Sequence, residues 1–227
     1  MATIDPIHLQ RPRRVSLRIT LAVIFLTIAG SLVYGWMRWK RFDEEWRAIG
    51  PCAASGGLYQ QPRLELKVPI FRQSDARWGK DKLGKTDASL GAEGCAVASA
   101  AMVLAAYGLE TDPGRLNAFL TEHEGYVGNG WLVWEKAAEL SEGKFEKAYE
   151  DAPSFQLIDM NLRAGNPVIA KLRAPEGTHF VVICGKDGYD YLTCDPGTAE
   201  GRGVYPLKEY GSKVEGIRFY RRATAKP

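Results

Sequence analysis

Residues 178–197, THFVVICGKDGYDYLTCDPG, hold the pattern that decides the fold. Two runs rich in β-branched and aromatic residues, 179–185 and 189–194, flank a turn-like stretch at 186–188, as in a β-hairpin. Three further runs of this kind occur at 167–172, 203–207 and 216–221. The C-terminal part of the chain therefore predicts a mainly antiparallel sheet.

Helical patterns precede these strands. Apolar residues recur at helical spacing in segments 94–107, 131–140 and 155–163, and in one that begins after Asp112. Gly108 fits the left-handed position that ends a helix, and Asp112-Pro113 is a typical helix start. A short strand-like run at 67–71 comes before them. Helices followed by strands indicate an α+β domain in which N-terminal helices pack on the sheet.

The N-terminal segment differs from the rest of the chain. Residues 19–37 carry no charged side chain, and as a helix they would span roughly 28 Å, about the thickness of a bilayer's hydrocarbon core. We expect a basic tail at 1–18, a transmembrane signal anchor at 19–37, a tether at 38–66 and the main domain at 67–222. A short tail before one span favours a single-pass membrane protein with an extracytoplasmic domain. A signal peptide cleaved after Thr27-Ile28-Ala29 is the alternative.

Composition narrows the class of protein. The chain has 227 residues, of which 45% are hydrophobic and 25% charged, as in globular proteins. Its net charge of +3 arises at the N-terminus: residues 1–41 carry seven basic residues and one acidic residue, and residues 42–227 carry 23 basic and 26 acidic residues. No clustered positive surface for nucleic acid is expected. Four cysteines are too few for a disulfide scaffold, and no CxxC pair predicts a metal site.

Cys95 is the first candidate for chemistry. It lies where a glycine-containing loop, ending in Gly94, enters the expected helix 94–107. The positive end of the helix dipole favours a thiolate there, and the free backbone N–H groups of the first turn can hold an oxyanion. A structural cysteine buried in an apolar helix is the alternative.

The hairpin supplies two more candidates. A three-residue loop at 186–188 would place His179 directly opposite Asp195, with their Cβ atoms roughly 5 Å apart. A two-residue loop would instead turn Asp195 to the other face of the sheet. The three-residue register also keeps Cys184 and Cys194 on the order of 13 Å apart, beyond the reach of a disulfide.

Cys95, His179 and Asp195 together are the parts of a nucleophilic acyl-transfer site. They provide a thiolate, a base and a carboxylate that orients the base. For His179 or Asp195 taken singly, a hydrogen-bonded strand histidine or a turn residue is the alternative.

Four motifs occur in a fixed order along the chain. They are VPIFRQSDARWG at 68–79, Gly94-Cys95 followed by SAAMVL at 99–104, HFVV at 179–182, and Asp195-Pro196. In this order they resemble the C-39-like peptidase family, related to the bacteriocin-processing double-glycine leader peptidases. The resemblance covers about residues 67–222.

The resemblance implies a papain-like fold and a mechanism without a cofactor. Cys95 would be the nucleophile, His179 the general base and acid, and Asp195 the residue that orients His179. Gln73 would donate to the oxyanion beside the Cys95 backbone N–H, although it precedes Cys95 by 22 residues, so that the intervening insertion must loop out. The transporter module of the leader peptidases is absent from these residues, so the resemblance does not imply leader processing.

The expected partner is a peptide or protein substrate. Gly94 adjoins the nucleophile, and Trp131 lies in the stretch GYVGNGWLVW at 125–134, which could line a substrate groove. Packing of Trp131 and Trp134 in the core is the alternative. These observations predict a membrane-anchored cysteine peptidase that forms an acyl-enzyme. A cell-wall amidase or acyltransferase using the same residues, or an inactive binding domain, are the alternatives.

Overall fold

The structure is a computed structural model, which describes residues 17–57, 61–175 and 177–223. The chain divides into two compact units, residues 1–44 and 45–227. Residues 17–44 of helix α1 (Leu17–Arg47) are the described part of the first unit. An 18-residue stretch of α1 has a mean hydropathy of 2.0, and none of it is buried. Helix α1 is therefore long and apolar enough to cross a membrane, a property that an N-terminal signal sequence shares.

One antiparallel sheet forms the centre of the second unit. Its strands follow the order β4 (Phe145–Asp151), β9 (Val214–Arg222), β5 (Val168–Ala174), β6 (Gly177–Gly188), β7 (Asp190–Cys194) and β8 (Tyr205–Pro206). Strand β1 (Gln61–Glu65) pairs with residues 185–188 of β6, which follow the part of β6 that pairs with β5. The predicted α+β class with a mainly antiparallel sheet is confirmed. Sequence periodicity does not reveal β1 or β4, because both are edge strands of mixed polarity.

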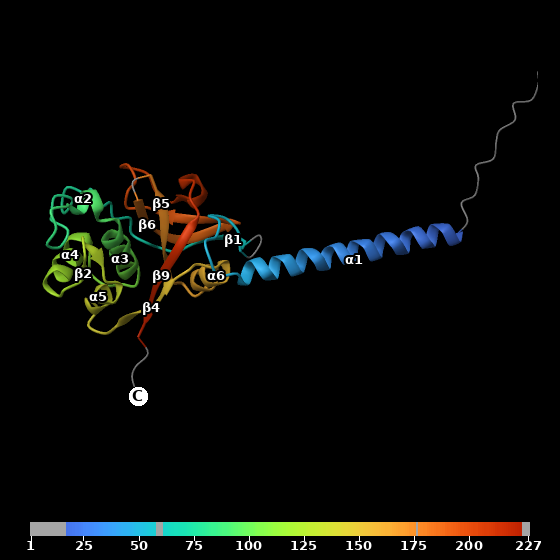
Figure 1. Ribbon diagram of the computed structural model, residues 1–227, viewed down its shortest axis with the longest axis horizontal. Coiled ribbons are helices and arrows are strands. Elements are labelled where there is room, and N and C mark those ends of the chain that lie inside the picture. Colours follow the sequence, from blue (N-terminus) through green and yellow to red (C-terminus); the bar gives the residue numbers. More distant parts are fainter. Residues whose placement is uncertain (1–16, 58–60, 176, 224–227) are drawn as a thin grey trace, which may run out of the picture. The chain divides into compact units, whose positions relative to one another are not determined.

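Helices cover both faces of this sheet (Figure 1). On one face lie α2 (Leu90–Glu93), α3 (Cys95–Ala106), α4 (Pro113–Glu122) and α5 (Trp134–Glu139). On the other lies α6 (Phe155–Arg163), with the bounds expected from the sequence. Helix α3 is apolar on all sides because it is enclosed between the sheet and the neighbouring helices.

Local sequence explains where the helices begin and end. The Asp112 carboxylate accepts a hydrogen bond from the Arg115 backbone N–H at 2.9 Å, and Pro113 occupies the first turn, as predicted. Gly108 follows α3 with a φ of +91°, in the left-handed region that ends a helix.

The helix expected at 131–140 begins later than predicted. Helix α5 starts at Trp134, while β3 (Trp131–Leu132) pairs with β2 (Tyr126–Val127) in a small ribbon. Gly128 and Gly130 both have positive φ, and together they reverse the chain between β2 and β3. Because the chain reverses here, the helix begins only at Trp134.

The stretch between α1 and residue 66 is hydrogen-bonded to the sheet along much of its length. Cys52 exchanges two backbone hydrogen bonds with Val214, and the Gly56 N–H donates to the Tyr189 carbonyl at 2.9 Å. Gly57 lies against the buried Lys186–Asp159 ion pair, whose Nζ–Oδ2 distance is 2.8 Å. The strand expected at 67–71 is wrong: the strand of this region is β1, and residues 66–70 form no regular element.

The predicted three-residue hairpin loop is also wrong. Asp187 pairs with Asp190, which leaves Gly188 and Tyr189 as a two-residue loop. Gly188 has a φ of +58°, and it occupies the first loop position, where a type II′ turn favours glycine. A glycine with positive φ at position 188 is compatible with both the two-residue and the three-residue loop, so the local sequence does not distinguish the two loop lengths.

A β-bulge reverses the effect of the shorter loop on the side-chain orientation of Asp195. Gly185 pairs with Leu192 and Ile183 pairs with Thr193, so Cys184 is an extra residue on β6. The shift of one residue returns Asp195 to the face of the sheet that carries His179. The two side chains are therefore diagonal neighbours rather than directly opposed residues.

The bulge changes the expected separation of Cys184 and Cys194. Both are fully buried on the α3 face of the sheet, and both are free thiols. Their side chains interact: the hydrogen bond to Cys194, together with burial, raises the pKa of the Cys184 thiol. The prediction that they lie far apart is therefore wrong, because it rested on the three-residue loop.

Candidate active site

Cys95 is the first residue of α3 and is almost completely buried. Gly94 separates it from α2 and caps both helices: its N–H donates to the Leu90 carbonyl at 2.8 Å, and its carbonyl accepts from Ala98 at 2.9 Å. A side chain at Gly94 has no space, because an added Cβ would lie 2.4 Å from the Leu90 carbonyl oxygen. The glycine thus allows α2 to turn directly into the helix that presents Cys95.

Ser99 joins this helix to the strand that carries the imidazole. Its hydroxyl donates to the Phe180 carbonyl at 3.1 Å, one helical turn after Cys95 and one residue after His179. The Ser99 side chain is fully buried, so the contact is shielded from water. It holds the first turn of α3 close to the beginning of β6.

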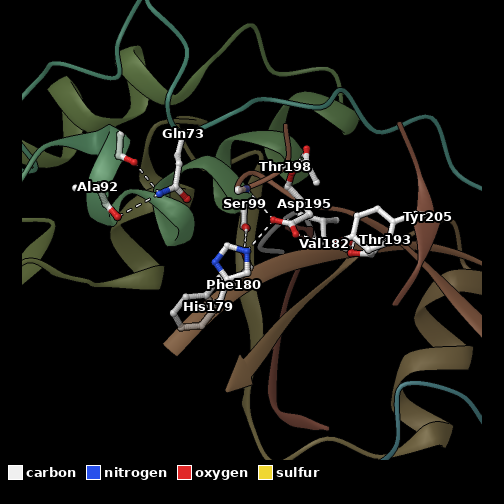
Figure 2. A network of polar contacts seen from close by, with 12 residues as sticks. Gln73, Ala92, Ser99, His179, Phe180, Val182, Thr193, Asp195, Thr198 and Tyr205 are labelled. Carbon is white, nitrogen blue, oxygen red and sulfur yellow. Dashed lines mark hydrogen bonds and ion pairs between the residues drawn. The ribbon is translucent and has the colours of Figure 1, made fainter. Parts of the chain in front are cut away.

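His179 lies between Asp195 and Cys95. Its Nε2 is 2.7 Å from Asp195 Oδ1, and its side chain is also within hydrogen-bonding reach of Cys95. Since Asp195 occupies Nε2, Nδ1 is the ring nitrogen left for the thiol; Figure 2 shows the two nitrogens directed to different sides. Burial opposes the charged imidazolium, but the hydrogen bonds to Asp195 and Cys95 outweigh it and raise the pKa of His179 to about 9.

Asp195 has a donor on each carboxylate oxygen. Oδ1 accepts from His179 and from the Gly197 backbone N–H at 2.7 Å, and Oδ2 accepts from the Tyr205 hydroxyl at 2.6 Å (Figure 2). Burial alone would raise the pKa of this carboxyl. The hydrogen bonds from His179, Tyr205 and Gly197 reverse that effect and hold the pKa below its usual range.

Two tyrosines at the site are missing from the sequence-based set. Tyr205 lies on β8 and donates to Asp195, and the ring of Tyr210 stacks on His179 at a centroid distance of 5.5 Å and an angle of 9°. Both belong to one short segment, residues 205–210, whose tyrosines carry no local motif. They reach the site only because β8 pairs with β7.

Gln73 lies beside the site with its side-chain amide already engaged. Its backbone N–H donates to the Pro196 carbonyl at 2.9 Å, which brings it next to Asp195. Its Nε2 donates to the carbonyls of Gly91 and Ala92 at 3.0 and 3.3 Å (Figure 2), and its Oε1 is buried without a hydrogen-bond partner. Residues 80–93, which precede Cys95, include α2, and both amide hydrogens of Gln73 are directed at carbonyls of this helix.

Trp131 is 76% exposed, whereas Trp134 is 4% exposed and packs in the core. The two tryptophans therefore differ, and core packing accounts for Trp134 alone. Trp131 and Val127 are opposed on the β2–β3 ribbon, and both are exposed there.

Among the residues that the structure describes, no group of three or more histidine, cysteine, aspartate or glutamate side chains is arranged to hold a metal ion. The site offers the chemistry of three side chains, those of Cys95, His179 and Asp195. A thiol next to an imidazole, itself hydrogen-bonded to an ionised carboxylate, is suited to nucleophilic attack on a carbonyl.

Comparison with known proteins identifies the family of the chain. The structure is similar to that of a candidate C39-like peptidase from Bacillus anthracis, with 19% identity and a TM-score of 0.48, over 72% of this chain and 100% of the other. None of the curated proteins compared with the chain matches it. Residues 65–224 match the model of the Peptidase_C39 like family, and so the chain belongs to that family.

Proposed function

We propose that the protein is a membrane-anchored cysteine peptidase that uses a Cys95-His179-Asp195 triad. The observation that supports this most is the imidazole of His179, which contacts Asp195 at Nε2 and lies within reach of Cys95. Membership of a peptidase family supplies the reaction class. The substrate is accordingly a peptide or protein.

The arrangement suits an acyl-enzyme mechanism. With the proton on His179, Cys95 is a thiolate that attacks the carbonyl carbon of the scissile bond. His179 then delivers its proton to the leaving nitrogen as the C–N bond breaks, which leaves a thioester on Cys95. A water molecule attacks the thioester while His179 accepts its proton. The C–S bond then breaks, the carboxylic acid is released and the thiolate–imidazolium pair is restored.

The oxyanion formed in each step needs hydrogen-bond donors. The N-terminus of α3 offers its first-turn N–H groups next to Cys95. We assign Gln73 as the second donor. It must release one of its two hydrogen bonds to Gly91 and Ala92 to serve in this way.

Substrate contacts are assigned to Gly94 and Trp131. Gly94 adjoins the nucleophile and carries no side chain, so a peptide that binds there would meet backbone alone. The exposed indole of Trp131 offers a flat apolar surface for a substrate side chain. Helix α1 anchors the chain, with the peptidase domain on the extracytoplasmic side.

Site-selective alkylation of the full chain tests the nucleophile. We expect iodoacetamide at pH 6 to modify Cys95 at least about 100-fold faster than Cys52, whose pKa burial raises to about 11. Peptide mass spectrometry locates each adduct. A Cys95→Ala variant should lose both the adduct and the cleavage of a mixed peptide library, while Cys52→Ala should keep them.

The same experiment separates the alternatives. Fast alkylation of Cys95 without cleavage of any peptide would indicate an amidase or acyltransferase on the same residues. Equal rates for Cys95 and Cys52 would contradict an active thiolate and leave a binding domain on a peptidase scaffold.

A further inference from the structure

Asp195 depends on a donor outside the three proposed catalytic residues. Its Oδ2 is buried and accepts from the Tyr205 hydroxyl at 2.6 Å, while Oδ1 serves His179 and Gly197. A buried carboxylate oxygen that loses its donor is strongly destabilised, so the Tyr205 hydroxyl bears directly on the charge state of Asp195.

The fold keeps Tyr205 in this position. β8 pairs with β7 so that Tyr205 lies opposite Thr193, two residues before Asp195. The guanidinium of Arg202 lies 3.7 Å from the centroid of the Tyr205 ring, and it is itself held by Glu209 at 2.7 Å. The position of the Tyr205 ring is therefore fixed by the pairing of β8 with β7 and by the Arg202 guanidinium on one face of the ring.

The same segment also contacts the imidazole. After Tyr205, the chain turns through a short 3₁₀ helix (Leu207–Tyr210), anchored by the buried Leu207, and ends with Tyr210 stacked on His179. One segment thus contacts both members of the His179–Asp195 pair from outside the helix that carries Cys95.

We propose that Tyr205 is a positioning residue for the peptidase reaction: its hydroxyl keeps Asp195 ionised and directed at His179. The inference rests on the proposed function of Cys95 and His179. Tyr205 itself touches neither the thiol nor the substrate, and it acts only through Asp195.

The test is the pH profile of Cys95 alkylation in the full chain, with each thiol resolved by mass spectrometry. Tyr205→Phe keeps the ring and removes the donor, so Asp195 becomes protonated at a higher pH. We expect the acid limb of the profile to move up by about one pH unit, with about a tenfold slower reaction at a pH on that limb and an unchanged plateau above it. Tyr107→Phe is the matched control, because it removes a similar hydroxyl, which donates to the Tyr220 carbonyl at 2.8 Å away from the site.

A double-mutant cycle decides whether Tyr205 acts through Asp195. In an Asp195→Asn background, Tyr205→Phe should have no further effect on the acid limb. An unchanged acid limb in Tyr205→Phe, an equal shift in Tyr107→Phe, or a shift that persists with Asp195→Asn would each overturn the proposal. Thermal unfolding of each variant confirms that the fold is intact. Alkylation needs no substrate, so failure of peptide cleavage is a separate result that does not affect this outcome.

Discussion

At the scale of single residues, His179 carries the chemistry of the site. Two hydrogen bonds, to Asp195 and Cys95, oppose the effect of burial on its charge and keep the imidazole protonated above its ordinary pKa of 6.5. A protonated imidazole at this position can act as a proton donor. In the proposed mechanism, His179 therefore holds the proton that it donates before any substrate binds.

The titration of His179 tests this balance. By NMR of the imidazole in the full chain, we expect a pKa near 9. The value should fall in Asp195→Asn and in Cys95→Ala, because each change removes a hydrogen bond that holds the proton. His123→Gln, which alters an exposed histidine stacked on Phe119, should leave it unchanged.

The same shift links stability to pH. The folded pKa lies above the unfolded value, so the stabilisation is fully present below about pH 6.5 and is lost as pH rises through about 9. Relative to a His179→Gln variant, the free energy of unfolding should decrease by up to about 3 kcal/mol over this range. A pKa at or below 6.5, or no pH-dependent difference between the two proteins, would contradict this account.

At the scale of elements, the junction of α2 and α3 determines where Cys95 lies. Glycine is needed at position 94 because the Leu90 carbonyl approaches closely, and not because of an unusual φ, which is −82°. Ser89 caps α2 through a hydrogen bond from the Ala92 N–H at 3.2 Å, and Ser99 then holds α3 against β6. Cys95, the proposed nucleophile, is positioned by contacts over the ten residues that surround it.

Gly94→Ala should displace this junction. The added Cβ meets backbone at 2.4 Å, which cannot be relieved by a rotation of a side chain. We expect Cys95 alkylation to slow by about 100-fold, since small displacements of a reacting group are costly, and the thermal unfolding temperature to fall. Gly203→Ala is the control, because an added Cβ there meets nothing within 4 Å. Equal behaviour of the two variants would show that the junction tolerates a side chain.

At the scale of the whole molecule, the chain combines an apolar N-terminal helix with a domain of the Peptidase_C39 like family. The compact unit that holds the site begins at residue 45. Residues 50–57 and β1 bind the sheet, so the segment expected as a tether is in large part an element of the domain. The polar and small residues of this segment resemble a linker in the sequence, because the strands to which they are hydrogen-bonded lie far along the chain.

Removal of residues 1–44 tests the anchor. We expect the full chain to remain in the membrane fraction after a carbonate wash, and the shortened chain to be soluble with unchanged Cys95 alkylation. The mass of the mature protein provides the control: a chain that begins near residue 30 would identify a cleaved signal peptide in place of an anchor. A shortened chain that stays with the membrane would show that the anchor lies elsewhere.

The sequence by itself determined the features that depend on near neighbours. Asp112-Pro113, Gly108 and the bounds of α6 follow from capping and periodicity within a few residues. The α+β class also follows from patterns of this kind. The residue types of the proposed triad were recognisable because each lies at the end of a strand or helix with a clear pattern.

Only the tertiary structure decided how those residues meet. The two-residue loop moves the pairing by three residues from the expected register and the bulge at Cys184 by one in the opposite direction. The net shift is even, so Asp195 stays on the face that carries His179. The donor from Tyr205 depends on the pairing of β8 with β7, and the pairing of β1 with β6 on contacts more than 100 residues apart. Such partners are determined by burial and hydrogen bonding across the sheet. A shift of one residue in the pairing would turn every side chain of a strand to the opposite face. The local sequence does not specify this register, because the strands that pair are distant in the chain.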